Sequence, residues 1–257
     1  MSYIANRDFL LEVAKGNVAG HSLVHKYGRN PAVPNGSWEP LTSTGILNFV
    51  TAAATVRIKA GNAADDAAGV GAQSIFINGI NDSGVETTEE KATAGAAAST
   101  ATTALFWRVF RAYVGDAGAY ATTATTVGAN TGVVTIENGT GGTDLLQIDA
   151  GAGQSEHCHY AIPAGKTAYF LGYQVTIDGK LAADVRIMTR SGLNDFTTPF
   201  SPKRERLYLS GVLGSNSDGG GVPLFSLPEY SDIWIEANGG GAATAASANF
   251  ELLLVDD

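Results

Sequence analysis

The sequence predicts a mainly β protein: an antiparallel β-sandwich, jelly-roll-like, with a short N-terminal helix and an extended arm. From residue 46 onward, segments of alternating apolar and polar residues recur, with turn residues every ~8–12 positions. Glycine accounts for 32 of 257 residues, about 12% against a usual ~7%, which suits a fold with many turns. Hydrophobic residues make up 44% of the chain, enough to form a folded core.

One helix is expected near the N-terminus, over residues 8–16. Phe9 and Val13 share a face there, and Gly16 stands where a C-cap would be. The next segment, 18–40, shows no clear period, and an irregular stretch of this length is unusual inside a compact domain. It is either a loop packed on its own domain or an extended arm laid on a neighbouring subunit, and we favour the arm.

Strands are expected at 55–59, 74–79 and 131–137, where apolar and β-branched residues recur. A longer strand at 105–114 is apolar on both faces except at Arg108 and Arg111. Such a strand is typically buried on both sides or lies at a subunit contact.

The strongest hairpin signal lies in 160–170, where Pro163 and Gly165 supply the turn. A β-meander is expected to continue through 169–189, where alternating residues surround a turn. With two later strands at 232–236 and 249–255, the chain has about nine or ten expected strands, the number typical of a sandwich or barrel.

Low-complexity segments divide the chain. Residues 117–129 form an Ala- and Thr-rich bridge between two groups of expected strands. We therefore predict a helix and extended arm over 1–45, a first β subdomain over 46–128 and a second over 129–257.

Charge and cysteine content argue against several classes of protein. The formal net charge is −9, and phosphate contacts need a cationic surface, so nucleic acid is not an expected partner. No stretch approaches the ~18 apolar residues of a membrane span, and the charged start of the chain does not resemble a signal peptide. A single cysteine excludes a disulfide framework within the chain.

No catalytic motif is apparent. The chain has no nucleophile elbow, phosphate loop or dinucleotide fingerprint, so we predict neither an enzyme nor a cofactor. His157 and His159 would point to the same face of a strand and could supply two metal ligands. A histidine pair without further partners is a weak match to a metal site, and polar residues on a strand are the simpler interpretation. No metal is predicted.

Candidate contact residues fall in two places. The arm carries polar and aromatic side chains, and residues 203–206 form the only basic cluster, where arginine could bind a neighbouring carboxylate through two hydrogen bonds. The candidate subunit or capsid contacts are His21, His25, Tyr27, Arg29, Trp38, Lys203, Arg204 and Arg206.

Several segments together resemble a group of uncharacterised virion structural proteins of tailed bacteriophages. They include NVAGHSLVHKYGRN at 17–30 and DDAAGVGAQSI at 65–75, followed in the same order by 160–169, 227–235 and 253–257. These are turn and strand signatures rather than catalytic motifs. The resemblance implies a component of a virus particle and carries over no active-site residue.

These observations predict a capsid decoration or cement protein. It would be a homo-oligomer, a trimer, that binds the major capsid protein on the virion surface and is made in the cytoplasm of the host bacterium. Deleting residues 1–40 would abolish attachment and leave the β core folded.

One alternative is a tail, collar or baseplate component. Another is a receptor- or carbohydrate-binding module, with Trp38, Trp107 and Trp234 as stacking platforms.

Overall fold

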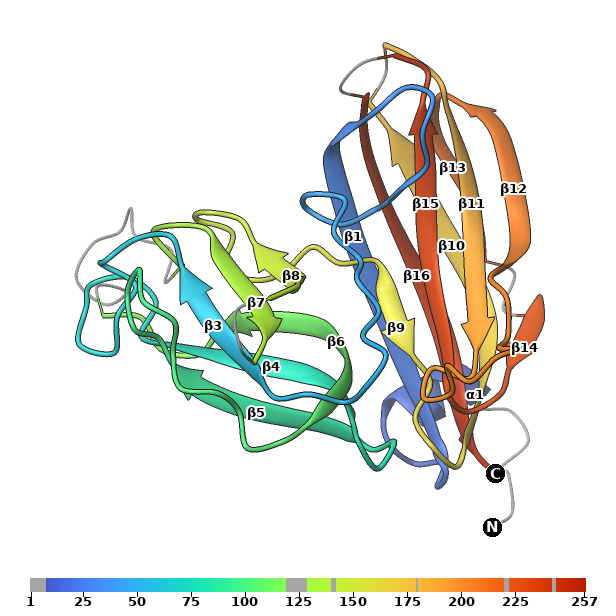
Figure 1. The fold of residues 1–257 in the computed structure, drawn as a ribbon. Coiled ribbons are helices and arrows are strands. Elements are labelled where there is room, and N and C mark those ends of the chain that lie inside the picture. Colours follow the sequence, from blue (N-terminus) through green and yellow to red (C-terminus); the bar gives the residue numbers. More distant parts are fainter. Residues whose placement is uncertain (1–7, 119–128, 140–141, 179, 220–221, 242–243) are drawn as a thin grey trace.

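The chain folds into four antiparallel β-sheets, arranged in two lobes (Figure 1). The computed structural model describes residues 8–118, 129–139, 142–178, 180–219, 222–241 and 244–257. The elements are α1 (Phe9–Ala14), β1 (His21–Val33), β2 (Glu39–Pro40), β3 (Val56–Ala60), β4 (Ser74–Asn81), β5 (Glu86–Ala92), β6 (Phe106–Val114), β7 (Val134–Asn138), β8 (Asp144–Ile148), β9 (His159–Ala161), β10 (Lys166–Ile177), β11 (Ala183–Ser191), β12 (Arg204–Val212), β13 (Gly214–Asp218), β14 (Phe225–Leu227), β15 (Ser231–Gly239) and β16 (Thr244–Asp256).

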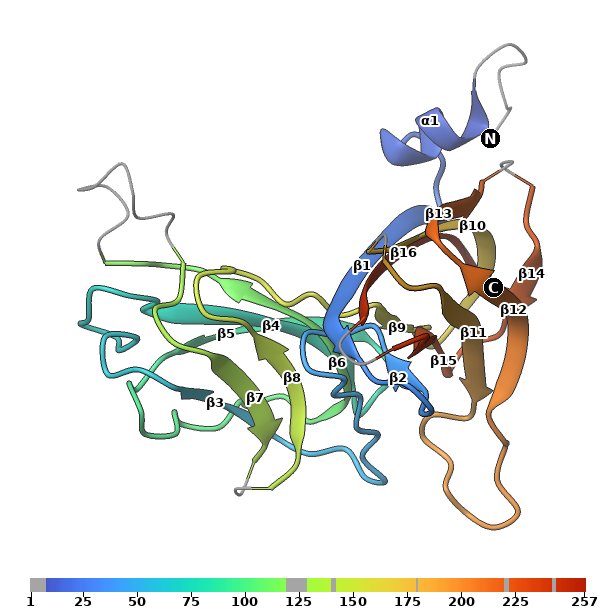
Figure 2. The ribbon, with the colours of Figure 1, turned by 90° about the horizontal axis from the view of Figure 1, so that it is seen from above.

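Two five-stranded sheets form the first lobe, here named the A/B lobe. Sheet A has the order β1-β16-β10-β13, with β14 also paired to β10, and sheet B has the order β12-β11-β15-β2, with β9 also paired to β15. Seen from above, the two sheets face each other (Figure 2). Val175 and Phe250 of sheet A join Ile187 and Ile235 of sheet B in one buried cluster, so burial of apolar surface holds the two sheets together.

Two three-stranded sheets form the second lobe, the C/D lobe. Sheet C has the order β3-β7-β8 and sheet D the order β5-β4-β6. Ile58 and Ile136 of sheet C pack with Ile77 of sheet D in a separate core. Ile80 and Phe110, although they lie on sheet D, belong to the core of the A/B lobe. The two lobes therefore share apolar contacts as well as a covalent chain.

The predicted single jelly-roll-like sandwich is wrong, although the chain is mainly β as expected. The strands form four small antiparallel sheets. The hairpin expected at 160–170 does not exist, because β9 pairs with β15 in sheet B while β10 pairs with β16 in sheet A. The expected meander is also wrong, since β10 and β11 lie in different sheets. Turn residues reverse the chain, but they do not decide whether the flanking strands hydrogen-bond to each other or face each other across a core.

The predicted extended arm is wrong over residues 21–33. These residues form β1, which pairs antiparallel with β16 from His21↔Val255 to Val33↔Thr244. The strand was not predicted partly because of which residues it buries. Lys26 and Asn30, which are polar, are buried on β1 together with Gly28, so the strand has little hydrophobic alternation to detect.

The helix predicted over 8–16 is confirmed as α1. Its N-cap is Asp8, whose carboxylate accepts a hydrogen bond from the Leu11 backbone N–H at 3.2 Å. Val13 packs against Leu171 and Leu253 in a small cluster on sheet A. The helix thus covers part of the A/B lobe.

The predicted subdomain boundaries do not follow the sheets. β7 and β8, placed in the second subdomain, pair with each other and β7 pairs with β3, so both belong to the C/D lobe. β1, placed in the arm, belongs to the A/B lobe together with strands from the C-terminal part of the chain. The C/D lobe is therefore inserted between β2 and β9. Most of the bridge at 117–129 lies outside the described residues.

Gly28 provides a test of this packing. At Gly28, β1 lies against the backbone of Leu41 and Cys158. A Cβ at this position would overlap the Leu41 carbonyl oxygen and the Cys158 backbone nitrogen. We expect Gly28→Ala to lower the free energy of unfolding by about 3 kcal/mol, because backbone cannot yield as a flexible side chain can. Urea unfolding measures the change.

Gly219→Ala is the matched control. A Cβ on Gly219 meets no atom within 4 Å, so this variant should stay within about 0.5 kcal/mol of wild type. Equal urea midpoints for the two variants would show that β1 does not pack as described.

Candidate functional site

Ionisable side chains are buried where the two lobes meet. β6 of the C/D lobe lies against β9 of the A/B lobe, next to β1 and β15. The buried ionisable residues of this region are Lys26, Arg108, His157, His159 and Asp232. A buried charge without a partner lowers the stability of the folded protein, so the partners of each of these groups matter.

Arg108 and Asp232 form a two-point ion pair across the lobe interface. Arg108 Nε donates to Asp232 Oδ1 at 2.9 Å, and Nη2 donates to Oδ2 at 3.0 Å. Both side chains are almost completely buried. Burial alone would raise the pKa of Asp232, but the Arg108 guanidinium and the His159 hydrogen bond together outweigh burial and lower the pKa below its usual value. Asp232 is therefore a carboxylate in the folded protein.

His159 extends this ion pair. Its Nε2 lies 2.9 Å from Asp232 Oδ1, and the Phe49 ring packs against it at a centroid distance of 5.8 Å. The same Phe49 ring covers the Arg108 guanidinium at 4.7 Å. Burial lowers the pKa of His159, and the hydrogen bond to Asp232 opposes this shift only in part. The result is a neutral imidazole beside a buried ion pair.

His157 and His159 lie side by side, as expected for alternate residues, with ring centroids 5.7 Å apart. Burial, followed by the neighbouring His159 and Lys26, lowers the pKa of His157 well below its usual value. Within the described residues, His157 Nε2 and His159 Nδ1 have no hydrogen-bond partner. No group of three or more His, Cys, Asp or Glu side chains among those residues could hold a metal ion.

Lys26 is a second polar link between the lobes. Its side chain leaves β1, and Nζ donates to the Phe110 carbonyl of β6 at 2.6 Å. Nζ also lies 5.0 Å from the centroid of the Phe110 ring. Burial lowers the pKa of Lys26 to about 7, so the ammonium and the free amine coexist at neutral pH.

Tyr160 provides a third link. Its hydroxyl donates to Glu86 Oε2 at 2.7 Å, which joins β9 to β5. The Tyr160 ring packs against Phe110 at 4.7 Å, and burial raises the pKa of the phenol. Lys26 of β1, Arg108 of β6 and Tyr160 of β9 thus each form a hydrogen bond across the same interface.

The buried cluster is poorly suited to catalysis. Asp232 and His159 resemble two members of a catalytic triad, but both are fully buried. The adjacent Cys158 is also buried, and burial raises the pKa of its thiol to about 12, so it stays protonated and weakly nucleophilic. The arrangement can hold two β lobes together, whereas a substrate could not reach it without opening the interface.

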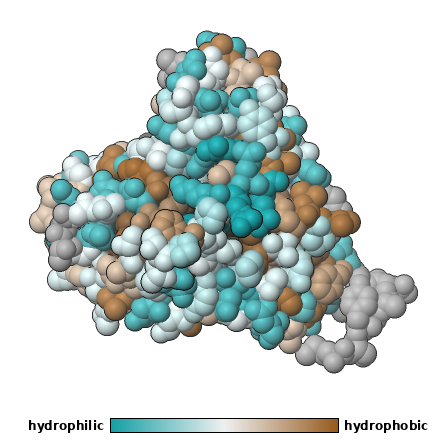
Figure 3. All heavy atoms as spheres, turned by 45° about the vertical axis from the view of Figure 1, so that its right-hand side comes forward, coloured by the Kyte–Doolittle hydropathy of each residue, from teal (hydrophilic) through white to brown (hydrophobic). Residues whose placement is uncertain are grey.

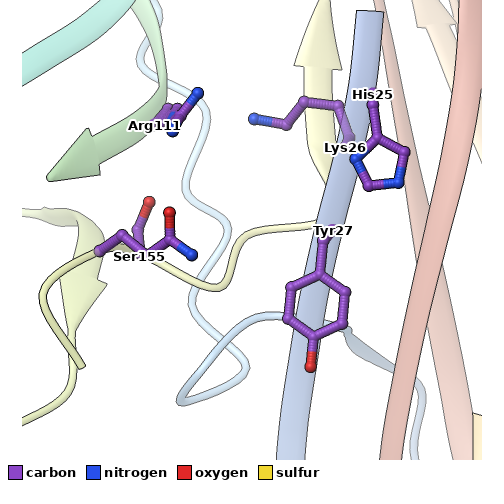
Figure 4. Close-up of a pocket in the computed structure, with 6 residues that line it drawn as sticks. His25, Lys26, Tyr27, Arg111 and Ser155 are labelled. Carbon is purple, nitrogen blue, oxygen red and sulfur yellow. The ribbon is translucent and has the colours of Figure 1, made fainter.

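A solvent-facing cavity adjoins this cluster (Figure 4). It has a volume of about 250 Å³ and is lined by His25, Lys26, Tyr27, Arg111, Gln154 and Ser155. A neighbouring cavity of about 220 Å³ shares His25, Lys26 and Arg111 and extends toward Glu86. The lining residues come from both lobes, so the cavity is a product of their packing.

The eight predicted contact residues lie in separate regions. His21, His25, Tyr27 and Arg29 are on β1, and of these only His25 and Tyr27 line the cavity. Residues 203–206 lie at the start of β12, on the opposite side of the A/B lobe from β1 (Figures 1 and 2). No single surface joins the two sets. On β1, His21 Nδ1 lies 2.9 Å from the Ala19 carbonyl oxygen, and Arg29 lines a hollow together with Asp178.

In the basic segment, Lys203 Nζ lies 5.3 Å from the Trp234 ring centroid, and Arg204 is exposed. Arg206 Nε donates a hydrogen bond to Thr189 Oγ1 at 3.0 Å.

The three tryptophans differ in exposure. Trp234 is fully buried and donates from Nε1 to Glu236 at 2.6 Å. Trp107 is partly buried against the A/B core. Trp38 is half-buried, with the Arg186 guanidinium 4.1 Å from its ring centroid and Tyr208 at 6.0 Å, so neighbouring side chains already cover part of the indole.

The sequence alone did not bring the buried cluster together. Arg108 stands out in the sequence as a charge in an apolar strand, but its partner Asp232 is 124 positions away. Asp232 likewise opens an apolar strand segment, 232–236. Because buried charges are normally paired, opposite charges in two largely apolar strands were the signal that could have suggested this contact.

Comparison with known proteins gives little beyond the geometry. No protein-family model matches the chain, and no curated protein matches it significantly. Structures of infectious bursal disease virus, strains Gt and Gx, align with TM-scores of 0.21 and 0.21 at 8% and 11% identity. The alignments cover 92% and 91% of this chain and 77% and 75% of theirs. Similarity this low supports no conclusion about fold or function. Among the described residues, no helix has the length and apolar content needed to cross a membrane.

Asp232→Asn tests the ion pair. It leaves the buried Arg108 guanidinium without a counter-charge, so we expect the free energy of unfolding to fall by about 3–5 kcal/mol. The double variant Arg108→Met/Asp232→Leu removes both charges and should recover much of this loss. Urea unfolding gives both values.

Glu205→Gln is the control for removing a carboxylate. Glu205 is exposed, and its Oε2 lies 3.9 Å from Arg186 Nη1. Removing this carboxylate should therefore change the free energy of unfolding by less than about 1 kcal/mol. If Asp232→Asn were as mild as this control, the two lobes would not depend on the buried pair.

The buried histidines predict a loss of stability in acid. Their lowered pKa values mean that the unfolded chain binds more protons than the folded protein below about pH 6.5. Stability should therefore fall as the pH drops below that value, by up to about 1.4 kcal/mol per pH unit for each histidine.

Urea midpoints at pH 7, 6 and 5 measure this slope. His157→Gln removes one titrating group and should flatten the slope, whereas His25→Gln, on an exposed side chain of β1, should retain it. A wild-type slope in His157→Gln would rule out the buried imidazole as its source.

Proposed function

We propose that this chain is a non-catalytic structural subunit of a bacteriophage virion that decorates the outer surface of the capsid. The observation that carries the proposal is the Arg108–Asp232 pair, in which two almost completely buried charges fix two β lobes into one unit. A protein that reinforces a shell needs a rigid shape more than an open reactive site. The resemblance of several segments to phage virion proteins supports the particle context.

Attachment to the shell would use the folded surface. Residues 21–33 are taken up in β1, so they are not available as an extended arm. The start of β12 is a better candidate, because Lys203 and Arg204 are exposed on a chain whose net charge is −9. A basic surface of this kind would dock on acidic groups of the major capsid protein and steer the approach of the two proteins.

Apolar side chains accompany this basic segment. Phe200 and Tyr208, on either side of it in the sequence, are 50% and 47% exposed. Figure 3 shows one face of the molecule on which a central hydrophilic patch is flanked by hydrophobic residues. Charged and aromatic groups together are typical of protein interfaces. In a homotrimer, and with many copies on one shell, such weak contacts would be multiplied by avidity.

Labelling the protein on virions that contain it tests the proposal. A capsid decoration protein gives a signal over the whole shell. A signal confined to one vertex would instead identify a tail, collar or baseplate component and overturn the proposed location. Glycan binding that is lost in Trp38→Ala would overturn it in favour of a receptor-binding module.

A charge-reversal pair tests the attachment surface. Lys203→Glu/Arg204→Glu should reduce occupancy on shells lacking the protein by at least tenfold, because like charges would then face each other. Lys59→Glu, on the exposed part of β3 in the other lobe, should bind as wild type does. Full occupancy of the double variant would exclude residues 203–204 as the attachment surface.

A further inference from the structure

The cavity between the lobes has more hydrogen-bond donors than acceptors. Figure 4 shows Lys26 extending from β1 toward Arg111, and Ser155 lies on the same side of the cavity as Arg111. Arg111 lies on β6, and Gln154 and Ser155 lie in the segment between β8 and β9. Groups from three separate parts of the chain therefore converge on one volume of about 250 Å³.

Several of these donors have no acceptor among the residues that the structure describes. The Lys26 ammonium has three N–H groups, and within the described residues only the Phe110 carbonyl accepts one. Arg111 stacks on the Tyr113 ring at 5.0 Å, but no described carboxylate or carbonyl accepts its N–H groups. Ser155 Oγ accepts from the Ala112 backbone N–H at 3.0 Å, which leaves its own hydroxyl proton for another partner.

The nearby carboxylates are engaged elsewhere. Glu86 accepts the Tyr160 hydroxyl and faces the neighbouring cavity. Glu156 is half-buried, and its charge interacts with Arg29. The surplus of unmatched donors is therefore not neutralised by an acid that lines the 250 Å³ cavity.

From this geometry we infer that the cavity between the lobes binds an oxyanion, a phosphate or carboxylate group, held by Lys26 and Arg111 with Ser155 as a further donor. The Arg111 guanidinium can present two parallel N–H groups to such an anion, and Lys26 supplies a point charge from the opposite wall. Because the ligands come from both lobes, an anion there would bridge them. This site is independent of the virion role proposed above.

Binding should be linked to protonation of Lys26. Its pKa of about 7 reflects burial above all, with the charge of Arg111 lowering it further and that of Glu86 raising it; the neutral Cys158, His157 and His159 lie close by. A bound anion favours the ammonium, so the protein should take up protons on binding at pH 8. It follows that affinity should decline from pH 7 to pH 9.

Isothermal titration with inorganic phosphate, and separately with acetate, tests the site in the full chain. We expect at least one of the two anions to bind, and proton uptake at pH 8 to appear as a dependence of the heat on the buffer. Arg111→Gln should weaken binding about tenfold, since it removes one charge-assisted contact. Binding of phosphate alone would identify a dianion site, and binding of acetate would extend it to carboxylate ligands.

Arg204→Gln is the matched control, because it removes the same charge from an exposed residue of β12, and β12 lies on the opposite side of the A/B lobe from β1. It should leave affinity within twofold of wild type. The inference fails if neither anion binds, if Arg204→Gln weakens binding as much as Arg111→Gln does, or if no protons are taken up. Circular dichroism of Arg111→Gln checks that its fold is intact, which is expected because the side chain is exposed.

Discussion

The contact on which the arrangement of the two lobes depends is the buried ion pair between Arg108 and Asp232. Each member is almost completely buried in a largely apolar strand, so neither could remain charged at low cost without the other. Buried pairs of this kind add little net stability compared with apolar replacements, but they penalise every arrangement in which the partners are apart. The pair therefore selects one relative position of the lobes more than it strengthens either core.

Apolar packing and polar links act together at this interface. Ile80 and Phe110 extend the A/B core into sheet D, which supplies non-directional attraction. Lys26 and Tyr160 add directional contacts around the same Phe110 side chain. A cavity adjoins the same interface, and residues of both lobes line it. The inferred anion site is thus a by-product of how the lobes are joined.

The sequence predicted individual strands better than their partners. β4, β6 and β7 are visible as apolar or alternating segments, and α1 is marked by its cap and its apolar face. β1 was missed because its buried positions hold a lysine, a glycine and an asparagine. The hairpin at 160–170 was wrong because Pro163 and Gly165 encode a reversal, while the choice of partner depends on β15 and β16 far along the chain.

The same limit applies to the site. His157 and His159 were expected to share one face of a strand; their rings do lie together, although His157 precedes β9. The ion pair and the cavity arise from contacts between distant strands, which no local pattern contains. What the sequence does record is the anomaly of a charged residue in an apolar strand, and such anomalies point to partners that only the three-dimensional fold identifies.

The pairing of β1 with β16 also bears on synthesis at the ribosome. β1 is translated early, yet it pairs in sheet A with β16, residues 244–256, so sheet A stays incomplete until those residues leave the exit tunnel. Sheets C and D need only residues 56–148 and can assemble while translation continues. During that interval β1 exposes an unpaired backbone edge whose polar inward residues make it a poor template for aggregation.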